Sequence, residues 1–283
     1  MTSELIRLES VSVVYRRGKV SSPVVRDVSL GINIGETLGL VGESGSGKST
    51  IGNVILGLVP AAGGRILFDG EDITHVGSRR RRELTREIQV VFQDPYGSLN
   101  PTRTVGATLT ESIRAQGNRE SSRSIANQVA HTLEAVGMSS TAAQRYPTEF
   151  SGGQRQRIAI ARALVVNPRL IVCDEAVSAL DLSIQAQVLN LLKQLKEERG
   201  LSYLFISHDL AVVAHAADRI AVLERGTIAE YDTVDRVMGD PQHPYTRMLL
   251  AAAPVPNPDE QAARRRLFLR YRERYLSADS ISV

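Results

Sequence analysis

The segment at positions 42–49, Gly-Glu-Ser-Gly-Ser-Gly-Lys-Ser, constrains the fold of this chain more than any other because it matches G-x-x-x-x-G-K-[ST] in full. An apolar run, Leu38–Val41, comes directly before it, and Thr50–Leu56 continues in a helical pattern. The glycines let backbone N–H groups converge on an anion, and the N-terminus of the following helix adds the positive end of its dipole. The sequence therefore predicts a strand, a phosphate-binding loop and a helix in succession.

Two side chains of the loop and two later carboxylates predict a site for a nucleoside triphosphate and Mg²⁺. We expect Lys48 to neutralise the β- and γ-phosphates and the Ser49 hydroxyl to ligate Mg²⁺. The apolar run Leu170–Cys173 ends in Asp174 and Glu175, and ligands of parallel sheets bind at the carboxyl ends of strands. Asp174 is expected to hold Mg²⁺ through water, and Glu175 to orient and polarise the water that attacks the γ-phosphate.

Short apolar runs recur along the chain, separated by polar or helical stretches. Nearly continuous apolarity is typical of strands that are buried on both faces, as in parallel sheets. The spacing of Ile184, Val188, Leu191 and Leu195 predicts an amphipathic helix that Gly200 closes. Alternating strands and helices favour an α/β fold with a phosphate-loop core and a mostly parallel sheet. Its predicted strands are Leu38–Val41, Gln89–Phe92, Leu170–Cys173, Leu204–Ile206 and Ile220–Leu223.

The regions around this core differ from it in pattern. β-like stretches at Ile6–Tyr15, Val24–Ile34 and Arg65–Asp69, with turn signals at Arg17–Gly18 and Gly63–Gly64, predict a smaller N-terminal antiparallel β subdomain. Residues 102–150 are polar and helical, which predicts an inserted α-helical subdomain at about 102–165. Three prolines shortly after Ala253 predict a linker. We therefore expect one nucleotide-binding domain over residues 1–253 and a C-terminal linker and basic tail over residues 254–283.

Composition narrows the class of protein. A hydrophobic fraction of 42% excludes general disorder, and a net charge of +3 is too small to argue for nucleic acid as a partner. The single cysteine, Cys173, excludes an internal disulfide and any four-cysteine metal or iron–sulfur site. The sequence has no apolar stretch long enough to span a bilayer and no signal-peptide pattern at its start, so we expect a cytoplasmic location.

A second anion-binding pattern decides between the possible classes of phosphate-loop protein. Ser151-Gly152-Gly153-Gln154 lies within EFSGGQRQRIAIARAL, where the glycines permit close backbone approach and Ser151 can cap the following helix. This segment resembles the signature of ATP-binding cassette (ABC) ATPases, and the resemblance covers about residues 5–250. Gln93 resembles the Q-loop glutamine of that family, and His208 in ISHDL resembles its switch histidine. Ser178-Ala-Leu-Asp181 is similar to the D-loop, and Tyr15 to the aromatic residue that stacks on adenine.

The resemblance implies ATP and Mg²⁺ as cofactors and two cassettes that close head to tail, with each ATP between the phosphate loop of one and the signature segment of the other. It implies catalytic roles for Glu175, His208, Gln93 and Lys48, and Mg²⁺ contacts for Ser49, Gln93 and Asp174. The implied nucleotide contacts are Tyr15, Gly42, Glu43, Ser44, Gly45, Ser46, Gly47, Lys48, Ser49, Thr50, Ser151, Gly152, Gly153, Gln154 and Asp181.

Longer segments, VFQDPYGSLNP and PQHPYTRMLL among them, resemble the ATPase subunits of oligopeptide and dipeptide importers, most closely the second of their two ATPases. The resemblance implies two membrane-spanning permease subunits, a sister ATPase or a second copy of this chain, and an extracytoplasmic solute-binding protein as partners. It places the chain at the cytoplasmic face of the membrane. Nickel importers are close relatives, so the solute stays open. Most members have proline after the acidic pair, and Ala176 there predicts a looser loop.

Two other classes of function fit the sequence less well than an importer subunit. A soluble ABC ATPase that acts on nucleic acid or ribosomes usually has two cassettes or a long coiled-coil insertion, which 283 residues do not accommodate. A nucleotide switch that does not hydrolyse ATP would lack Glu175 or His208, and both are present.

The tail has two open interpretations. Residues 259–276 contain six arginines, and Leu267, Phe268, Tyr271 and Tyr275 fall near one helical face. The segment is either a solvated helix packed lightly on the cassette or a basic helix that touches the membrane surface or an acidic partner.

Overall fold

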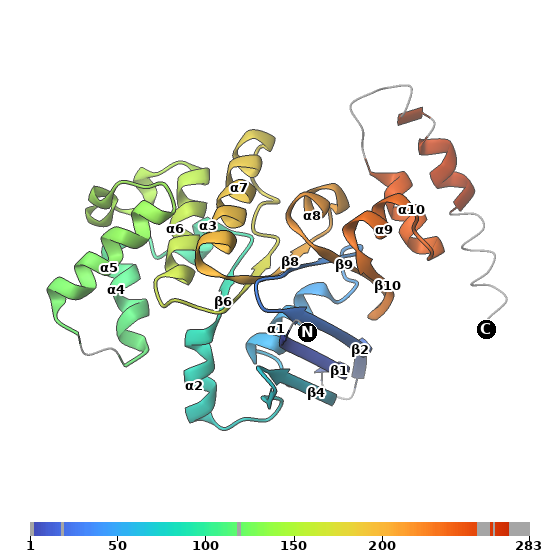
Figure 1. Cartoon of the computed structure of the whole chain (residues 1–283), viewed down its shortest axis with the longest axis horizontal. Helices are drawn as coiled ribbons and strands as arrows, with labels where there is room; N and C mark the ends of the chain where they lie inside the picture. Colours follow the sequence, from blue (N-terminus) through green and yellow to red (C-terminus); the bar gives the residue numbers. More distant parts are fainter. Residues whose placement is uncertain (1–2, 18–19, 118–119, 254–260, 263, 272–283) are drawn as a thin grey trace.

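The computed structural model describes residues 3–17, 20–117, 120–253, 261–262 and 264–271. Its centre is a six-stranded sheet in the order β10-β9-β3-β8-β7-β6 (Figure 1). Every neighbouring pair in it is parallel except β9 and β10, which form an antiparallel hairpin. This confirms the predicted, mostly parallel sheet. The strands are β3 (Thr37–Val41), β6 (Ile88–Val91), β7 (Leu170–Asp174), β8 (Ser202–Ser207), β9 (Arg219–Glu224) and β10 (Thr227–Thr233).

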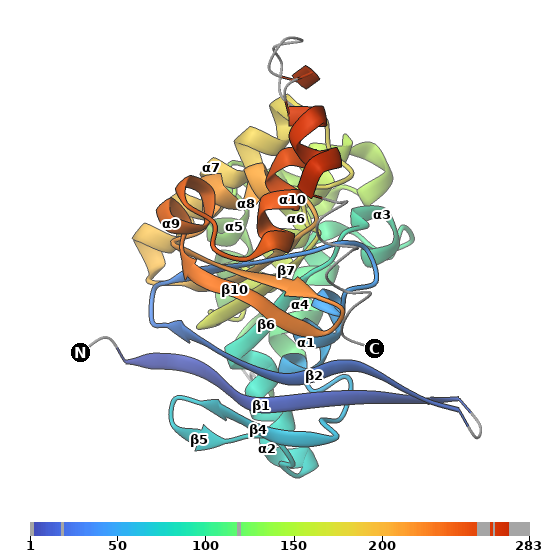
Figure 2. The same cartoon turned by 90° about the vertical axis from the view of Figure 1, so that its right-hand side faces the viewer.

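The second sheet is antiparallel and has the order β2-β1-β4-β5. It is formed by β1 (Glu4–Arg17), β2 (Val20–Asn33), β4 (Gly63–Phe68) and β5 (Glu71–Asp72). This sheet lies on one side of the core, and helix α1 (Lys48–Leu56) is placed between it and the parallel sheet (Figure 2). The predicted N-terminal β subdomain is therefore confirmed.

One turn of this subdomain was predicted wrongly. Gly63 and Gly64 begin strand β4 rather than forming a turn, and Gly63 pairs with Ser12 of β1. Gly64 has a φ of 82°, and a Cβ there would lie 2.3 Å from the carbonyl oxygen of Ser10. The glycine is needed because β1 has a register shift at this point, where its backbone approaches β4 closely. The other predicted turn includes Gly18, which lies outside the described residues.

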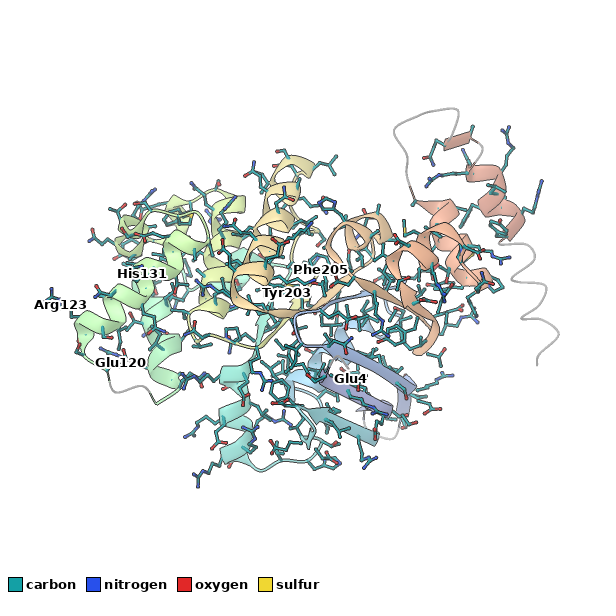
Figure 3. The ribbon with its side chains drawn as sticks, viewed as in Figure 1. Glu4, Glu120, Arg123, His131, Tyr203 and Phe205 are labelled. Atoms are coloured by element: carbon teal, nitrogen blue, oxygen red, sulfur yellow. The ribbon has the colours of Figure 1, made fainter. Side chains whose placement is uncertain are left out.

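Helices cover the far side of the parallel sheet and extend from one end of it. The described part of the segment between β6 and β7 contains helices only, as predicted from residue 102 onward: α3 (Pro95–Ser98), α4 (Val105–Ala115), α5 (Ser122–Ala135), short 3₁₀ turns at Ser140–Gln144 and Pro147–Glu149, and α6 (Gly152–Leu164). These helices form a group away from the antiparallel sheet (Figure 1), and Glu120, Arg123 and His131 lie at its outer end (Figure 3). The predicted amphipathic helix is α7 (Leu182–Arg199), and Gly200 ends it with a φ of 64°.

The sequence patterns did not predict α3, the strands β5 and β10, or four further helices. Helix α2 (Ser78–Glu87) is rich in arginine and buries only Leu84, so it has almost no apolar face to detect. Helix α8 (Leu210–Ala216) follows β8. Helices α9 (Val234–Gly239) and α10 (Pro244–Ala252) follow β10. Residues 264–271 are also helical, and Phe268 and Tyr271 pack partly buried against the core.

Two apolar cores explain why the strands of the parallel sheet are apolar at nearly every position. Leu170 and Val172 of β7 face the core shared with α1 and the antiparallel sheet, whereas Ile171 and Cys173 face the helices on the other side. Alternate residues of a strand point to opposite faces, so burial of both faces removes the polar half of the pattern. Tyr203 and Phe205 of β8, at the centre of the molecule, belong to the same helix-covered core (Figure 3).

Candidate functional site

The phosphate-binding loop joins β3 to α1, as the motif predicts. Gly47 caps α1 with a φ of 109°, and a Cβ there would lie 2.9 Å from the carbonyl oxygen of Val24. A Cβ on Gly42 would lie 2.1 Å from the carbonyl oxygen of Leu223. Glycine is therefore required at both positions by the close approach of neighbouring backbone, and the loop is held tightly against β2 and the end of β9.

Lys48 lies at the start of α1 and is held by the loop that precedes it. Its Nζ donates to the carbonyl oxygens of Gly42 at 2.8 Å and Glu43 at 2.7 Å. Only 5% of the residue is exposed, and this burial lowers the pKa of Lys48, while the carboxylates of Glu175 and Asp174 oppose the shift. The ammonium is therefore held by two carbonyl oxygens of the loop and interacts electrostatically with both predicted acidic residues.

Ser49 and Asp174 come together although 125 residues separate them. The Ser49 hydroxyl donates to Oδ1 of Asp174 over 2.9 Å. Burial raises the pKa of Asp174, as does the neighbouring Glu175, whereas the Ser49 hydrogen bond and Lys48 lower it. A hydroxyl and a desolvated carboxylate at this spacing offer the hard oxygen ligands that Mg²⁺ prefers, and a cation would relieve the repulsion that raises the pKa of Asp174. The residues fit the ion that the sequence predicts.

Glu175 and His208 follow adjacent parallel strands, β7 and β8, and their side chains meet at the carboxyl edge. Nδ1 of His208 lies 3.4 Å from Oε1 of Glu175, and the Glu175 amide donates to the Ile206 carbonyl over 3.0 Å. Glu175 has a φ of 50°, a left-handed conformation that side chains other than glycine adopt at a cost. This conformation turns the chain sharply at the strand end, directly after Asp174.

The loop after Glu175 is held by hydrogen bonds and by burial, and the looser loop expected from Ala176 stays a prediction. The amide and hydroxyl of Ser178 both donate to the Glu175 carbonyl, at 3.1 and 3.0 Å. Ala176 and Val177 are each 2% exposed, so burial holds the loop without a proline. Asp181 accepts a hydrogen bond from the Ile184 amide over 2.9 Å and thereby caps α7. Its carboxylate therefore has a local structural role beside the predicted nucleotide contact.

The signature segment begins helix α6, where its sequence forms a capping box. The Ser151 hydroxyl accepts from the Gln154 amide at 3.3 Å, and Oε1 of Gln154 accepts from the Ser151 amide at 3.0 Å. A Cβ on Gly153 would lie 2.5 Å from Ile184 of α7, so this glycine permits the two helices to pack closely. Helix α6 contacts α3, α4, α5, α7 and β6, whereas α1 lies against β2, β6, β7 and β8. The two predicted anion sites of this chain thus lie on different parts of the molecule (Figure 1).

Gln93 and Tyr15 have different positions relative to the acidic pair. Gln93 follows β6, whose last residue pairs with Cys173, so it emerges at the same sheet edge as Asp174. It is exposed there. Tyr15 lies opposite Ser22 near the tip of the β1–β2 hairpin, and 41% of it is exposed. An exposed aromatic ring at this position is free of packing against the apolar core and is available for stacking.

One contact of the phosphate loop had no signal in the sequence. The Glu43 amide donates to the hydroxyl of Tyr245 over 3.1 Å, across 202 residues. Local periodicity and motif spacing carry no information about a pair so far apart, and only the fold reveals it.

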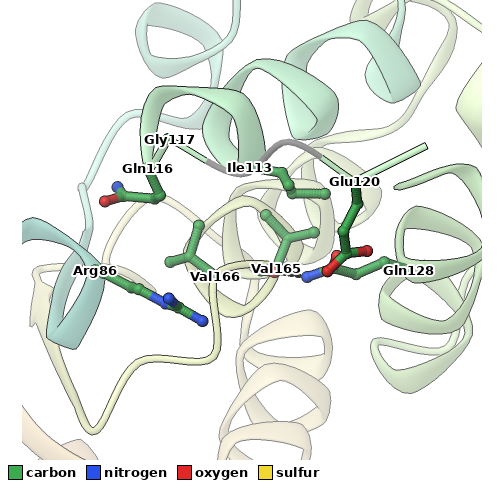
Figure 4. Close-up of a pocket in the computed structure, with 8 residues that line it drawn as sticks. All are labelled: Arg86, Ile113, Gln116, Gly117, Glu120, Gln128, Val165 and Val166. Carbon is green, nitrogen blue, oxygen red and sulfur yellow. Dashed lines mark hydrogen bonds between the residues drawn. The ribbon is translucent and has the colours of Figure 1, made fainter. Parts of the chain in front are cut away.

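A hollow of about 290 Å³ lies elsewhere, between α2, α4, α5 and the end of α6 (Figure 4). Gln128 spans part of it and donates to the Val165 carbonyl over 2.7 Å. Its lining contains none of the predicted site residues. The residues that line it are Arg86, Ile113, Gln116, Gly117, Glu120, Gln128, Val165 and Val166.

The chain is similar to ATP-binding proteins of importers along most of its length. OppF of Bacillus subtilis (strain 168), an oligopeptide transport ATP-binding protein, is 46% identical over 93% of this chain and 87% of its own length. OppF of Salmonella typhimurium is 49% identical over 83% of this chain and 70% of that protein. The glutathione import ATP-binding protein GsiA of Shigella flexneri is 51% identical over 85% of this chain, which spans only 38% of GsiA.

Solved structures agree with these sequence similarities. A dimeric ATP-binding cassette in a post-hydrolysis state with ADP and Pi has a TM-score of 0.72 and 29% identity over 81% of this chain and 98% of its own. The cbiO1 protein of Clostridium perfringens, part of an ABC transporter complex, has a TM-score of 0.76 and 25% identity over 84% of this chain and 92% of its own. The ABC transporter family model matches residues 25–178, which include the phosphate loop, the signature segment and the acidic pair. The chain therefore belongs to the ABC transporter family, as the order and spacing of its motifs predict.

Proposed function

We propose that this chain is the ATP-hydrolysing subunit of an importer and that the imported solute is a peptide. The observation that carries the ATPase assignment is the meeting of Ser49, Asp174, Glu175 and His208 at one edge of the parallel sheet. The names of the relatives refer to oligopeptide transport and to import of glutathione, which is itself a tripeptide. These names support a peptide as the solute.

Each residue at the sheet edge is proposed to have its own role in ATP hydrolysis. Mg²⁺, when bound, would offset the negative charge of the phosphates. Lys48 and the amides of the loop hold the phosphates, and Ser49 and Asp174 present oxygen atoms to the ion. Glu175 orients the attacking water and accepts its proton, while His208, in contact with Glu175, keeps that carboxylate in place. Gln93 is proposed to complete the surroundings of the water and the ion.

The signature segment supports a role for a second cassette. Because Ser151–Gln154 lies on a different part of the chain from the phosphate loop, we propose that it completes the phosphate site of a partner cassette, either a sister ATPase or a second copy. ATP then favours the closed dimer because it contacts both subunits only in that state, and hydrolysis removes the advantage. Tyr15 is proposed to stack on adenine, and Asp181 to lie close to the nucleotide across the interface.

The segment at 95–104 is proposed to face a membrane-spanning permease subunit. Helix α3 packs against α6, and Arg162 of α6 donates a hydrogen bond to the Ser98 carbonyl. This contact ties the segment to the helix that begins with the signature. A movement of α6 at the dimer interface would therefore be transmitted to the permease through the packing of α3 against α6. Two permease subunits and an extracytoplasmic binding protein complete the proposed complex, with this chain at the cytoplasmic face.

The domain limits are proposals as well. The helices between α4 and α6 support a helical subdomain at about 102–165 within a nucleotide-binding domain of residues 1–253. Residues 254–283 form the proposed linker and basic tail. No helix among the described residues is both long and apolar enough to cross a bilayer.

The function is tested by purifying the chain with its membrane subunits, in liposomes, and measuring ATP hydrolysis with candidate peptides and with nickel. We expect peptides to raise the rate in the presence of the binding protein. Stimulation by nickel alone would overturn the peptide assignment, and absence of MgATP hydrolysis in the assembled complex would overturn the ATPase assignment.

A further inference from the structure

Helix α10 contacts the phosphate loop from outside the region matched by the family model. The hydroxyl of Tyr245 accepts a hydrogen bond from the Glu43 amide at 3.1 Å, and only 2% of Tyr245 is exposed. The carbonyl oxygen of the same residue, Glu43, accepts from Nζ of Lys48 at 2.7 Å. Glu43 is therefore held from two sides, by the lysine of the loop and by a tyrosine of α10.

The position of Tyr245 is itself fixed by the strand beside it. Oε1 of Glu230, on β10, accepts from the Gln242 amide at 2.8 Å, and its Oε2 accepts from the His243 amide at 3.1 Å. His243 caps α10 through its Nδ1, which accepts from the Tyr245 amide at 3.2 Å. Helices α9 and α10 thus lie over β10 with their connection pinned to it (Figure 2). The hydroxyl of Tyr245 is presented to the loop by a rigid support.

We propose that Tyr245 is a positioning residue for nucleotide binding, which acts by holding the Glu43 peptide so that the phosphate loop keeps its anion-binding conformation before the nucleotide arrives. The proposal rests on the proposed ATPase function. A loop that is already ordered loses less conformational entropy on binding, so the hydrogen bond contributes to affinity without contact with the ligand. Burial raises the pKa of Tyr245 to about 12, so the hydroxyl stays neutral at working pH.

The test compares nucleotide affinity in the full chain after Tyr245→Phe and after Tyr231→Phe. Tyr231 is a matched control because its hydroxyl also forms a hydrogen bond with the backbone: it donates to the Gly31 carbonyl at 2.7 Å. This contact lies away from the phosphate loop. We expect Tyr245→Phe to raise the dissociation constants for MgADP and MgATP, measured by calorimetry, by about 3- to 10-fold, the range of one lost hydrogen bond. Tyr231→Phe should leave both constants unchanged, even if both variants unfold at a lower temperature.

A double-mutant cycle with Glu230→Ala separates positioning from general destabilisation. Glu230→Ala should also weaken MgADP binding, but it should have a much smaller effect in the Tyr245→Phe background, because both changes act through the same contact. Unchanged affinity after Tyr245→Phe, or full additivity in the cycle, would overturn the proposal. If the unaltered chain bound no MgATP, the proposed function itself would fail instead.

Discussion

Glu175 is the residue on which the chemical assignment depends most. It sits at the end of β7 in a left-handed conformation, with His208 at 3.4 Å. Replacement by glutamine keeps the shape and removes the proton acceptor. We expect Glu175→Gln to bind MgATP normally but to hydrolyse it at least ~10²-fold more slowly in the assembled transporter, since a positioned base contributes about that much. Single-turnover assays measure this, and a near-normal rate would exclude the role.

Asp174 is expected to lower the stability of the nucleotide-free chain. Its pKa is raised chiefly by burial, so the ionised form is less stable in the folded chain than in the unfolded one. This cost is absent below the unfolded pKa and is fully present once the pH exceeds the folded pKa. Asp174→Asn should therefore raise the unfolding temperature of the nucleotide-free chain by a few degrees at neutral pH while abolishing Mg²⁺-dependent binding. The gain should shrink as the pH falls, and a gain independent of pH in thermal unfolding would contradict this origin.

Among the elements, α7 depends on its C-terminal glycine. Gly200 has a φ of 64°, and a Cβ there would meet no atom within 4 Å, so only backbone strain opposes a larger residue. We expect Gly200→Ala to lower the free energy of unfolding by about 1 kcal/mol, without changing nucleotide affinity. Gly239 in α9 is the control, because it also has open space and lacks a positive φ. Gly239→Ala should be neutral or stabilising in denaturant titrations, and equal losses at both sites would exclude backbone strain as the cause.

At the scale of the whole molecule, we propose that a complete site requires two chains. The signature and the phosphate loop lie on different parts of one cassette (Figure 1), so a single copy is expected to present two half-sites. The purified chain should therefore hydrolyse ATP slowly, with a rate per molecule that rises with concentration or on addition of a sister cassette and permeases. Measurement of activity across a dilution series tests this. Full activity that persists at high dilution would show that one chain suffices.

The tail belongs to the same scale because its described helix, residues 264–271, packs on the cassette. Phe268 and Tyr271 are partly buried against the core, and a groove of about 410 Å³ lies between their helix and α8–α10. Deleting residues 259–283 should lower the unfolding temperature but leave MgADP affinity intact, because α10 and Tyr245 are retained. Calorimetry checks the affinity, and vesicle co-sedimentation across a salt series checks whether the arginines bind anionic lipid. Lost nucleotide binding would show that the domain extends beyond residue 253.

The sequence by itself determined the class of fold, the family and the motif residues, because these depend on short-range patterns. A few neighbouring residues are enough to encode the glycine-rich loop and the cap at Ser151. The same is true of the two apolar strands, one of which ends at Asp174 and the other directly before His208. Helix α2 escaped prediction because it buries a single side chain, and Gly63–Gly64 was misread because a turn and a close strand contact need the same residue type. The contacts between residues that are distant in the sequence depend on the tertiary structure. Adjacent parallel strands bring Glu175 to His208, and α10 returns over β10 to bring Tyr245 to Glu43. Such contacts follow from the order of strands and the packing of helices, which no local pattern specifies.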